Sequence, residues 1–321
     1  MTRVTRPVPA TALPMLNRRS FLRYSALTGA ALGGAGLLAA CGDDAAGPAN
    51  GTTPDGSKYG TVAIQLSWIK NIEFAGEYFA DSKGYFREAG FGSVNLVAGG
   101  AASTSVEAGL GTGKIWLGMS APQTTAPAVL EGLPAKIVGA TYQKNPFCIV
   151  SAAGSPIASP QDMKGRRIGV QDTNQLIFAA LLTANGMRPD DVTIVPAQFD
   201  PTPLTQETID NEREKLKAFL AAEIKGWRDA VADPAEGARL AVEVYGKDLQ
   251  LDLTEQTEEA IAQNDLVVSA DTAANGLFTM TDDLIERNIA ALGKSGIDIE
   301  ADRLFDMSVL AEVYAEQPDL K

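Results

Sequence analysis

A tryptophan, an amide and a carboxylate follow one another closely after an apolar run at residues 61–67. The indole of Trp68 offers a flat face on which a heteroaromatic ring can stack. Asn71 and Glu73 offer an amide and a hydrogen-bond acceptor for the N–H groups of such a ring. The alternatives are that Trp68 is a core aromatic and that Glu73 is favoured by the dipole at a helix start. These residue types suit a binding site for a small ring compound, and both structural alternatives stay open at this point.

Further polar side chains follow other predicted strands. In α/β domains, ligands bind beyond the carboxyl ends of the strands, near helix N-termini, so contacts are expected in these loops. The candidates are Ser120, Gln123, Tyr142, Gln143, Gln171, Thr173 and Asn174. Each has a structural alternative. The first two fit a turn, the tyrosine and its neighbouring glutamine fit hinge packing, and Thr173 or Asn174 fits a helix cap.

The residue types that the chain lacks restrict its chemistry. It has no histidine, which excludes a Ser-His-Asp triad, a Cys-His pair and His-ligated metal sites. One of its two cysteines, Cys41, is expected to carry lipid, which leaves Cys148 without a disulfide partner. Because Cys148 lies in the apolar run Phe-Cys-Ile-Val, we predict a buried, inert thiol. We therefore expect no enzyme activity, no metal and no cofactor.

The charge of the chain is strongly negative. The formal net charge is −13, and residues 1–40 contain five arginines and no acid, so the remainder is more acidic still. Such a surface repels nucleic acid and anionic lipid. We expect neither as a partner.

Strand and helix patterns alternate over the middle of the chain. Strands are predicted at residues 61–67, 93–97, 114–119, 135–140, 147–151, 167–170 and 192–196, and helices at residues 73–82, 126–131 and 174–185. A helix start is also predicted at Ser159, with Pro160 in the first position and Asp162 three residues after the serine. The alternation predicts an α/β fold with a mostly parallel sheet covered by helices. From residue 205 onward the pattern is almost wholly helical, and we expect no strand there.

The N-terminal segment resembles a bacterial export signal. Arg18 and Arg19, followed by Phe-Leu-Arg, resemble a twin-arginine motif, and residues 38–41, Leu-Ala-Ala-Cys, resemble a lipobox. The apolar run between them is at the short end for a membrane span. We expect cleavage before Cys41 and lipid on its sulfur; the alternative is an ordinary membrane anchor. Residues 42–58, rich in Gly, Pro, Asp and Ala, are expected to form a flexible tether.

Three separated segments resemble the family of solute-binding lipoproteins that serve importers of nitrate, taurine, sulfonates and thiamine-pyrimidine or flavin precursors. Residues 66–78 with 83–86 are similar to the first strand-to-helix unit of the pyrimidine and riboflavin branch. Residues 154–170 are similar to the entry to the family's second lobe, and residues 219–227 to its late helix. The family's eukaryotic branch is an intracellular enzyme that uses histidine, which this chain lacks.

The resemblance implies a two-lobe fold of the type II periplasmic-binding-protein kind. Residues 1–41 are then the lipoprotein signal and 42–58 the tether. Residues 59–150, together with C-terminal helices at about 240–321, are expected to form lobe one, and residues 151–239 lobe two. Leu204 and Thr205 are adjacent in this chain. In the family that it resembles, the corresponding segments are separated by a longer stretch with further strands. We therefore expect a truncated second lobe with an incomplete sheet and an exposed edge.

The resemblance also implies a function. The chain is expected to be a monomeric, lipid-anchored substrate-binding protein on the outer face of the cytoplasmic membrane. It would close by a hinge on a small heteroaromatic solute, such as a thiamine precursor or a riboflavin-like compound, and deliver it to the permease and ATPase of an ABC importer. Two alternatives remain open: a degenerate surface lipoprotein that no longer binds solute, and a binder of nitrate, sulfonate or taurine-type anions.

Overall fold

The computed structural model describes residues 56–100, 103–171, 174–197 and 204–321. All of them belong to one unit, Gly51–Lys321. The predicted export signal, Cys41 and most of the predicted tether lie outside the described residues. In the part of the chain that is described, no helix combines the length and the apolar character needed to cross a membrane.

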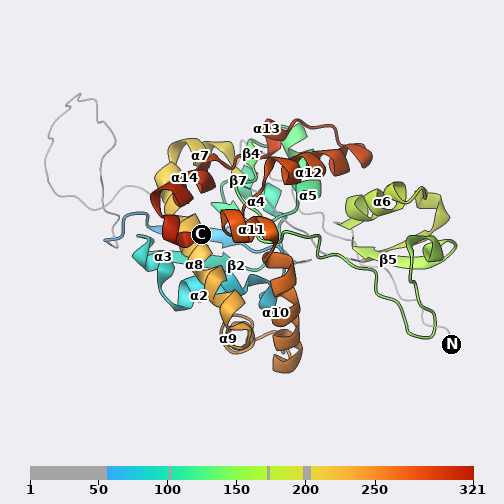
Figure 1. The fold of residues 1–321 in the computed structure, drawn as a ribbon, viewed down its shortest axis with the longest axis horizontal. Helices are drawn as coiled ribbons and strands as arrows, with labels where there is room; N and C mark the ends of the chain where they lie inside the picture. The colour runs from blue at the N-terminus through green and yellow to red at the C-terminus, as the bar shows by residue number, and fades with distance from the viewer. Residues whose placement is uncertain (1–55, 101–102, 172–173, 198–203) are drawn as a thin grey trace, which may run out of the picture. The chain divides into compact units, whose positions relative to one another are not determined.

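The first sheet has three parallel strands in the order β2-β1-β3, of which β2 is labelled in Figure 1. Strand β1 (Thr61–Gln65) pairs along its whole length with β2 (Ser93–Val97), and Gln65 at its end pairs with Gly118 of β3 (Leu117–Gly118). Side chains of β2 alternate between exposed and buried, which places one face of the strand against the core. The predicted parallel sheet is confirmed, although β3 is shorter than the predicted run at residues 114–119.

Short helices connect these strands. They are η1 (Ile72–Phe74), α2 (Ala75–Ser82), α3 (Tyr85–Glu88), α4 (Val106–Gly111) and α5 (Pro122–Leu130). Helix α2 ends where Gly84 adopts a φ of 81°, a left-handed conformation that glycine adopts without steric cost. The side-chain oxygen of Ser105 accepts a hydrogen bond from the backbone N–H of Ala108 and so caps α4.

Helix α8 (Arg213–Ala232) packs against α2 and α3 in the largest core of the molecule. The ring of Phe219 stacks on that of Phe86 of α3, with centroids 5.6 Å apart and planes 5° from parallel. The side chain of Trp227 is buried in the same core. The sequence-based division places residues up to 239 in lobe two, yet α8 shares its core with β1 and α2. A periodic apolar face shows that a helix is buried but not which sheet it covers, and we therefore assign α8 to the first lobe.

The C-terminal part is helical, as predicted. Its elements are α7 (Gln206–Asn211), α9 (Pro234–Arg239), the π-helical turn η5 (Leu240–Tyr245), α10 (Leu253–Val267), α11 (Ala270–Asn275), α12 (Asp282–Lys294), α13 (Ala301–Leu304), α14 (Ser308–Glu316) and η6 (Pro318–Leu320). Strand β4 (Ala135–Lys136) pairs antiparallel with β7 (Leu204–Thr205), and a second core cluster forms beside it from α5, α12 and α13.

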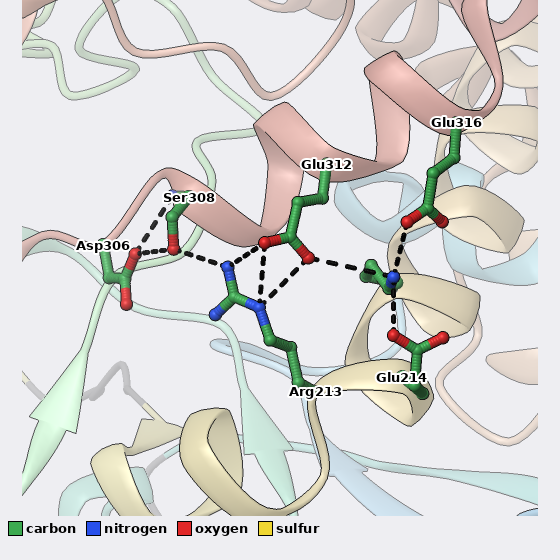
Figure 2. Close-up of polar contacts among 7 residues, drawn as sticks. Arg213, Glu214, Asp306, Ser308, Glu312 and Glu316 are labelled. Carbon is green, nitrogen blue, oxygen red and sulfur yellow. Dashed lines mark hydrogen bonds and ion pairs between the residues drawn. The ribbon is translucent and has the colours of Figure 1, made fainter.

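A charge network joins α8 to α14 (Figure 2). The Arg213 guanidinium donates to Glu312 at 2.7 and 3.1 Å and to the hydroxyl of Ser308 at 2.8 Å. One turn further along α8, the Lys217 ammonium lies 2.7 Å from the Glu316 carboxylate. Because these carboxylates face solvent, water screens each pair and its contribution to stability is small. The network mainly fixes the position of α14 along α8.

A second, smaller sheet lies in the segment from residue 159 to residue 197. Its elements are η2 (Pro160–Met163), β5 (Arg167–Gln171), α6 (Gln175–Ala184), η4 (Pro189–Asp191) and β6 (Thr193–Ala197). The predicted start at Ser159 is confirmed as a capping box with Asp162. Strands β5 and β6 pair in parallel, and α6 covers them over a core that contains Met163, Phe178 and Leu182 (Figure 1).

The predicted strand at residues 147–151 is wrong. The structure assigns no strand to this segment, and Val150 is 88% exposed. Cys148 is exposed as well, which corrects the predicted buried thiol. The apolar, β-branched composition is typical of a strand, but a strand also needs a neighbouring chain for its backbone hydrogen bonds, and none pairs with this segment among the described residues.

The small sheet is expected to be the least stable part of the described fold. Two paired strands alone are marginally stable in water, so β5 and β6 depend on the packing of α6 and on a small core. In hydrogen exchange at neutral pH, we expect backbone amides of β5 and β6 to exchange at least roughly 100-fold faster than those of β1. Mass spectrometry of peptides from both sheets measures this. Equal protection of β5 and β1 would contradict the expectation and would mean that both sheets unfold together.

Candidate functional site

The loop after β1 brings the first group of predicted residues together. Asn71 is 7% exposed; its side-chain oxygen accepts from the backbone N–H of Glu73 at 3.2 Å, and its amide nitrogen donates to the Glu73 carboxylate at 3.2 Å. Asn71 is thus the N-cap of η1. Trp68 is partly buried against the main core, and its carbonyl accepts from the N–H of Gly99. A side chain on Gly99 would overlap with the backbone of Leu66, so glycine allows these two loops to meet.

Tyr142 reaches the same place from a distant part of the chain. Its hydroxyl donates to the side-chain oxygen of Gln263 at 2.8 Å and lies 3.5 Å from the carbonyl oxygen of Glu73. Gln263 in turn donates to the carbonyl of Ile72 at 3.4 Å. Gln256, which lies on the same face of α10 about two turns earlier, accepts from the N–H of Ile72 at 2.9 Å. Helix α10 therefore holds the first turn after the Trp68 loop. We call the group Trp68, Asn71, Glu73, Tyr142 and Gln263 the polar wall.

Both α10 glutamines are absent from the sequence-based candidates. They are 7% and 6% exposed and alternate with the buried Ala260 and Val267 along α10. The available signal is this spacing, 256, 260, 263 and 267, which follows the helical period. Glutamine is polar, so its presence on the inward face of a helix indicates that a buried backbone or ligand group needs a hydrogen-bond partner.

Burial determines the protonation behaviour of the polar wall. It raises the pKa of the Glu73 carboxyl, and the charge of Glu259 on α10 adds to this, while the hydrogen bond from Asn71 opposes it. Burial also raises the pKa of Glu259. The hydroxyl of Tyr142 has its pKa raised by burial and by the nearby acids, so it remains a donor at all ordinary pH values. The wall thus offers hydrogen-bond acceptors with negative charge, amides and aromatic surface.

Ser120 and Gln123 lie in the loop after β3. Because Gln65 at the end of β1 pairs with Gly118 of β3, this loop and the Trp68 loop leave the sheet at the same edge. The hydroxyl of Ser120 is exposed and accepts from the hydroxyl of Thr125 at 3.0 Å. Gln123 is half-buried in the first turn of α5. Both remain candidates from their position alone.

Gln143 follows Tyr142 but its amide points to other partners. Its nitrogen donates to the carbonyls of Ala140 and Thr279, at 2.9 and 3.1 Å. Its side-chain oxygen is buried and has no hydrogen-bond partner within the described residues. These contacts fit the packing alternative that the sequence left open for Gln143, and its side-chain oxygen remains as an acceptor for a ligand or a water molecule.

Two further candidates lie at the ends of elements around the small sheet. Gln171 is the last residue of β5 and Asn174 precedes α6, whereas Thr173 lies outside the described residues. The side chain of Asn174 makes no capping hydrogen bond to α6, so the predicted cap is not formed by this residue.

Two surface hollows in the structure lie away from the polar wall. One, of about 430 Å³, lies between α9, η5 and α10 and is lined by residues that include Asp233, Glu236 and Arg239. The other, of about 470 Å³, lies between residues 148–152 and β5. Neither is lined by a residue of the polar wall. Within the described residues, no group of three or more His, Cys, Asp or Glu side chains is placed to hold a metal ion.

Comparison with known proteins gives a family match and a curated relative for part of the chain. Residues 71–210 match the family model described as NMT1/THI5 like. The riboflavin-binding protein RibY of Chloroflexus aurantiacus is 31% identical over 159 residues, which cover 46% of this chain and 42% of RibY. The chain thus matches less than half the length of this curated relative.

Solved structures extend the likeness to the fold. The nitrate-binding protein NrtA of Synechocystis PCC 6803 superposes with a TM-score of 0.57 at 10% identity, covering 82% of this chain and 91% of NrtA. The aliphatic sulphonate-binding protein SsuA of Escherichia coli superposes with a TM-score of 0.54 at 12% identity, covering 78% and 91%. The predicted periplasmic-binding-protein fold is therefore confirmed; at these identities the likeness concerns the fold alone.

Proposed function

We infer that this chain, whose residues 71–210 match the NMT1/THI5-like family model and whose fold is like that of SsuA and NrtA, captures a small heteroaromatic solute at the polar wall. The convergence of the Trp68 loop and Tyr142 carries the proposal, because the tyrosine hydroxyl lies 3.5 Å from the Glu73 carbonyl although the residues are 69 positions apart. The solute class is a pyrimidine or flavin, and the similarity to RibY supports the flavin.

The wall supplies the interactions that such a ring needs. The Trp68 indole gives a flat apolar face, and the Glu73 carboxylate accepts hydrogen bonds from ring N–H groups. Amides on Asn71 and Gln263 can donate or accept, which suits the mixed edge of a pyrimidine or an isoalloxazine. Two carboxylates, on Glu73 and Glu259, disfavour nitrate and sulfonate, because like charges repel. We propose binding rather than catalysis, in line with the relatives whose names describe binding proteins.

The remaining parts of the proposal concern place and partners. A lipid on Cys41 would hold the monomeric protein at the outer face of the cytoplasmic membrane, and hinge closure of the two lobes on the solute would present it to the permease and ATPase of an importer. The relatives named above are binding proteins, which supports the general role. Gln171, Thr173 and Asn174 would then contact the solute from the second lobe.

A titration of tryptophan fluorescence tests the proposal. The chain has three tryptophans, and riboflavin or an aminopyrimidine that stacks on Trp68 should quench a saturable part of the signal. Trp68→Phe should abolish that part. Trp116→Phe should retain it, because Trp116 contacts Glu212 and Phe219 within the core. A well-folded protein that gives no saturable response to any of these compounds would contradict the proposal.

A second candidate function is favoured by one observation. The small sheet has only two strands among the described residues, so the second lobe offers little surface to close on a solute. A surface lipoprotein that no longer binds solute fits this. The same titration separates the two, because the second candidate gives no response with any solute while the protein remains folded.

A further inference from the structure

Helices α2 and α8 cross at two glycines. A Cβ atom on Gly226 would overlap with the carbonyl oxygen of Gly76, and one on Gly76 would overlap with the indole of Trp227. The two backbones therefore lie in direct contact, and this contact is the most extensive between any two helices of the described fold. Side chains next to this contact between α2 and α8 are therefore shielded from water.

Two carboxyl groups lie beside this crossing, one from each helix. Glu77 of α2 is 1% exposed and Glu223 of α8 is 2% exposed. One side-chain oxygen of each, Oε2 of Glu77 and Oε1 of Glu223, has no hydrogen-bond partner among the described residues. We call these two residues the carboxyl pair. A buried, unpaired carboxylate costs several kcal/mol, so two of them together cannot both be ionised at low cost.

The charged groups on the surrounding elements do not neutralise the carboxyl pair. Lys83, at the end of α2, binds Asp229 at 2.9 Å, and Arg239 of α9 binds Glu236 at 2.7 Å. Lys217 of α8 binds Glu214 of the same helix and Glu316 of α14. The other titratable groups near α2 are Glu73 of η1, Glu259 of α10, Tyr78 and Tyr142, and Tyr245 of η5, which donates to Asp81. None of these is a cation.

We propose that the carboxyl pair is a proton-operated contact between α2 and α8: the folded state keeps a proton on the pair, and loss of that proton weakens the helix crossing. A protonated carboxyl can donate to its ionised neighbour, as two carboxyls that share one site do. The inference goes beyond the proposed function, because it concerns the stability of the first lobe and needs no solute.

The direction of the pH effect follows from the titration of the pair. Burial raises the pKa of Glu77 from 4.5 to about 7, and burial together with the charge of Glu77 raises the pKa of Glu223 well above 4.5. The folded protein therefore holds protons that the unfolded chain releases. This contribution to stability is fully present below pH 4.5 and is lost as the pH rises through 7 and beyond. The lowered pKa values of Glu236 and Glu312 act only below this window.

Thermal unfolding of the full chain between pH 5 and pH 8 tests the proposal. We expect the midpoint temperature to fall by roughly 5–10 °C over this range. Glu223→Gln, which replaces a protonated carboxyl by a neutral group of the same shape, should remove at least half of the fall. Glu88→Gln is the matched control, because Glu88 is 63% exposed on the neighbouring α3, and it should retain the full slope.

A second measurement detects the proton on the carboxyl pair directly. Infrared spectra at pH 6 should show the carbonyl band of a buried protonated carboxyl, and Glu77→Gln should reduce that band. Glu73 and Glu259 also have raised pKa values, so the difference between variants is the decisive quantity. A midpoint temperature that stays constant or rises from pH 5 to pH 8 would overturn the proposal, as would an unchanged slope in the Glu77→Gln/Glu223→Gln double variant. If the variants do not fold, the absence of the carbonyl band in the unmodified protein would overturn it.

Discussion

Replacing Gly226 with alanine is expected to lower the free energy of unfolding by about 3 kcal/mol or more, because overpacking against rigid backbone is among the costliest core changes. The added Cβ would overlap with the carbonyl oxygen of Gly76 and lie 2.8 Å from the Cβ of Ala80. Neither neighbour is the flexible end of a side chain. Helices α2 and α8 would have to separate, and the contacts of Trp227 and Phe219 would loosen with them.

Gly293→Ala is the matched control for this prediction. Gly293 lies in α12, where nothing is within 4 Å of an added Cβ, so alanine should stabilise the protein by roughly 0.5–1 kcal/mol through the lower entropy of the unfolded chain. Urea unfolding monitored by circular dichroism measures both variants. Similar midpoints for the two would show that the helix crossing can relax without cost.

Glu73→Gln is expected to weaken solute binding by about 10- to 100-fold, because a hydrogen bond to a charged group is worth about 1.5–3 kcal/mol and each 1.4 kcal/mol is a factor of ten. The side chain keeps its shape, and its oxygen can still accept from Asn71, so the loop after β1 should remain in place. Fluorescence titration with riboflavin or an aminopyrimidine measures the affinity.

The pH dependence of binding gives this prediction a second readout. Burial raises the pKa of Glu73, so the carboxylate takes up a proton at a higher pH than an exposed glutamate does. The affinity of the unmodified protein should therefore fall as the pH is lowered towards 5, while that of Glu73→Gln should vary less. Glu258→Gln, an exposed site on α10, should behave like the unmodified protein. Equal affinities of Glu73→Gln and Glu258→Gln would exclude Glu73 from the binding site.

Local sequence patterns predicted helices and strands better than they predicted which segments pack or pair with them. The alternation at β1 and β2, the capping box at Ser159 and the helical stretch after residue 205 were all confirmed, because each depends on residues close together in the chain. The strand predicted at residues 147–151 was wrong, because a strand depends on a neighbour that the local pattern does not supply. The exposure of Cys148 follows from the same absence of a partner.

The candidate site shows the same division. Trp68, Asn71 and Glu73 were found from their order after a strand, since the carboxyl end of a parallel strand is where ligands bind. Gln263 was missed, although it contacts both Tyr142 and Ile72, because it lies about 190 residues from the loop that it supports. The helical period of the sequence predicts that Gln263 lies on the buried face of α10. It does not predict which residues Gln263 contacts.

The sequence alone determined the chemistry that this protein has available. The absence of histidine, the excess of acids and the order of side chains after β1 are properties of composition and local order, and no fold changes them. The tertiary structure decided which distant groups meet: Tyr142 with Glu73 and Gln263, and α8 with α2. It also decided that the carboxyl groups of Glu77 and Glu223 are buried beside the helix crossing. These contacts depend on the free energy of packing the whole chain. Burial in that packing decides whether a glutamate side chain is an ionised surface group or a protonated carboxyl in the core.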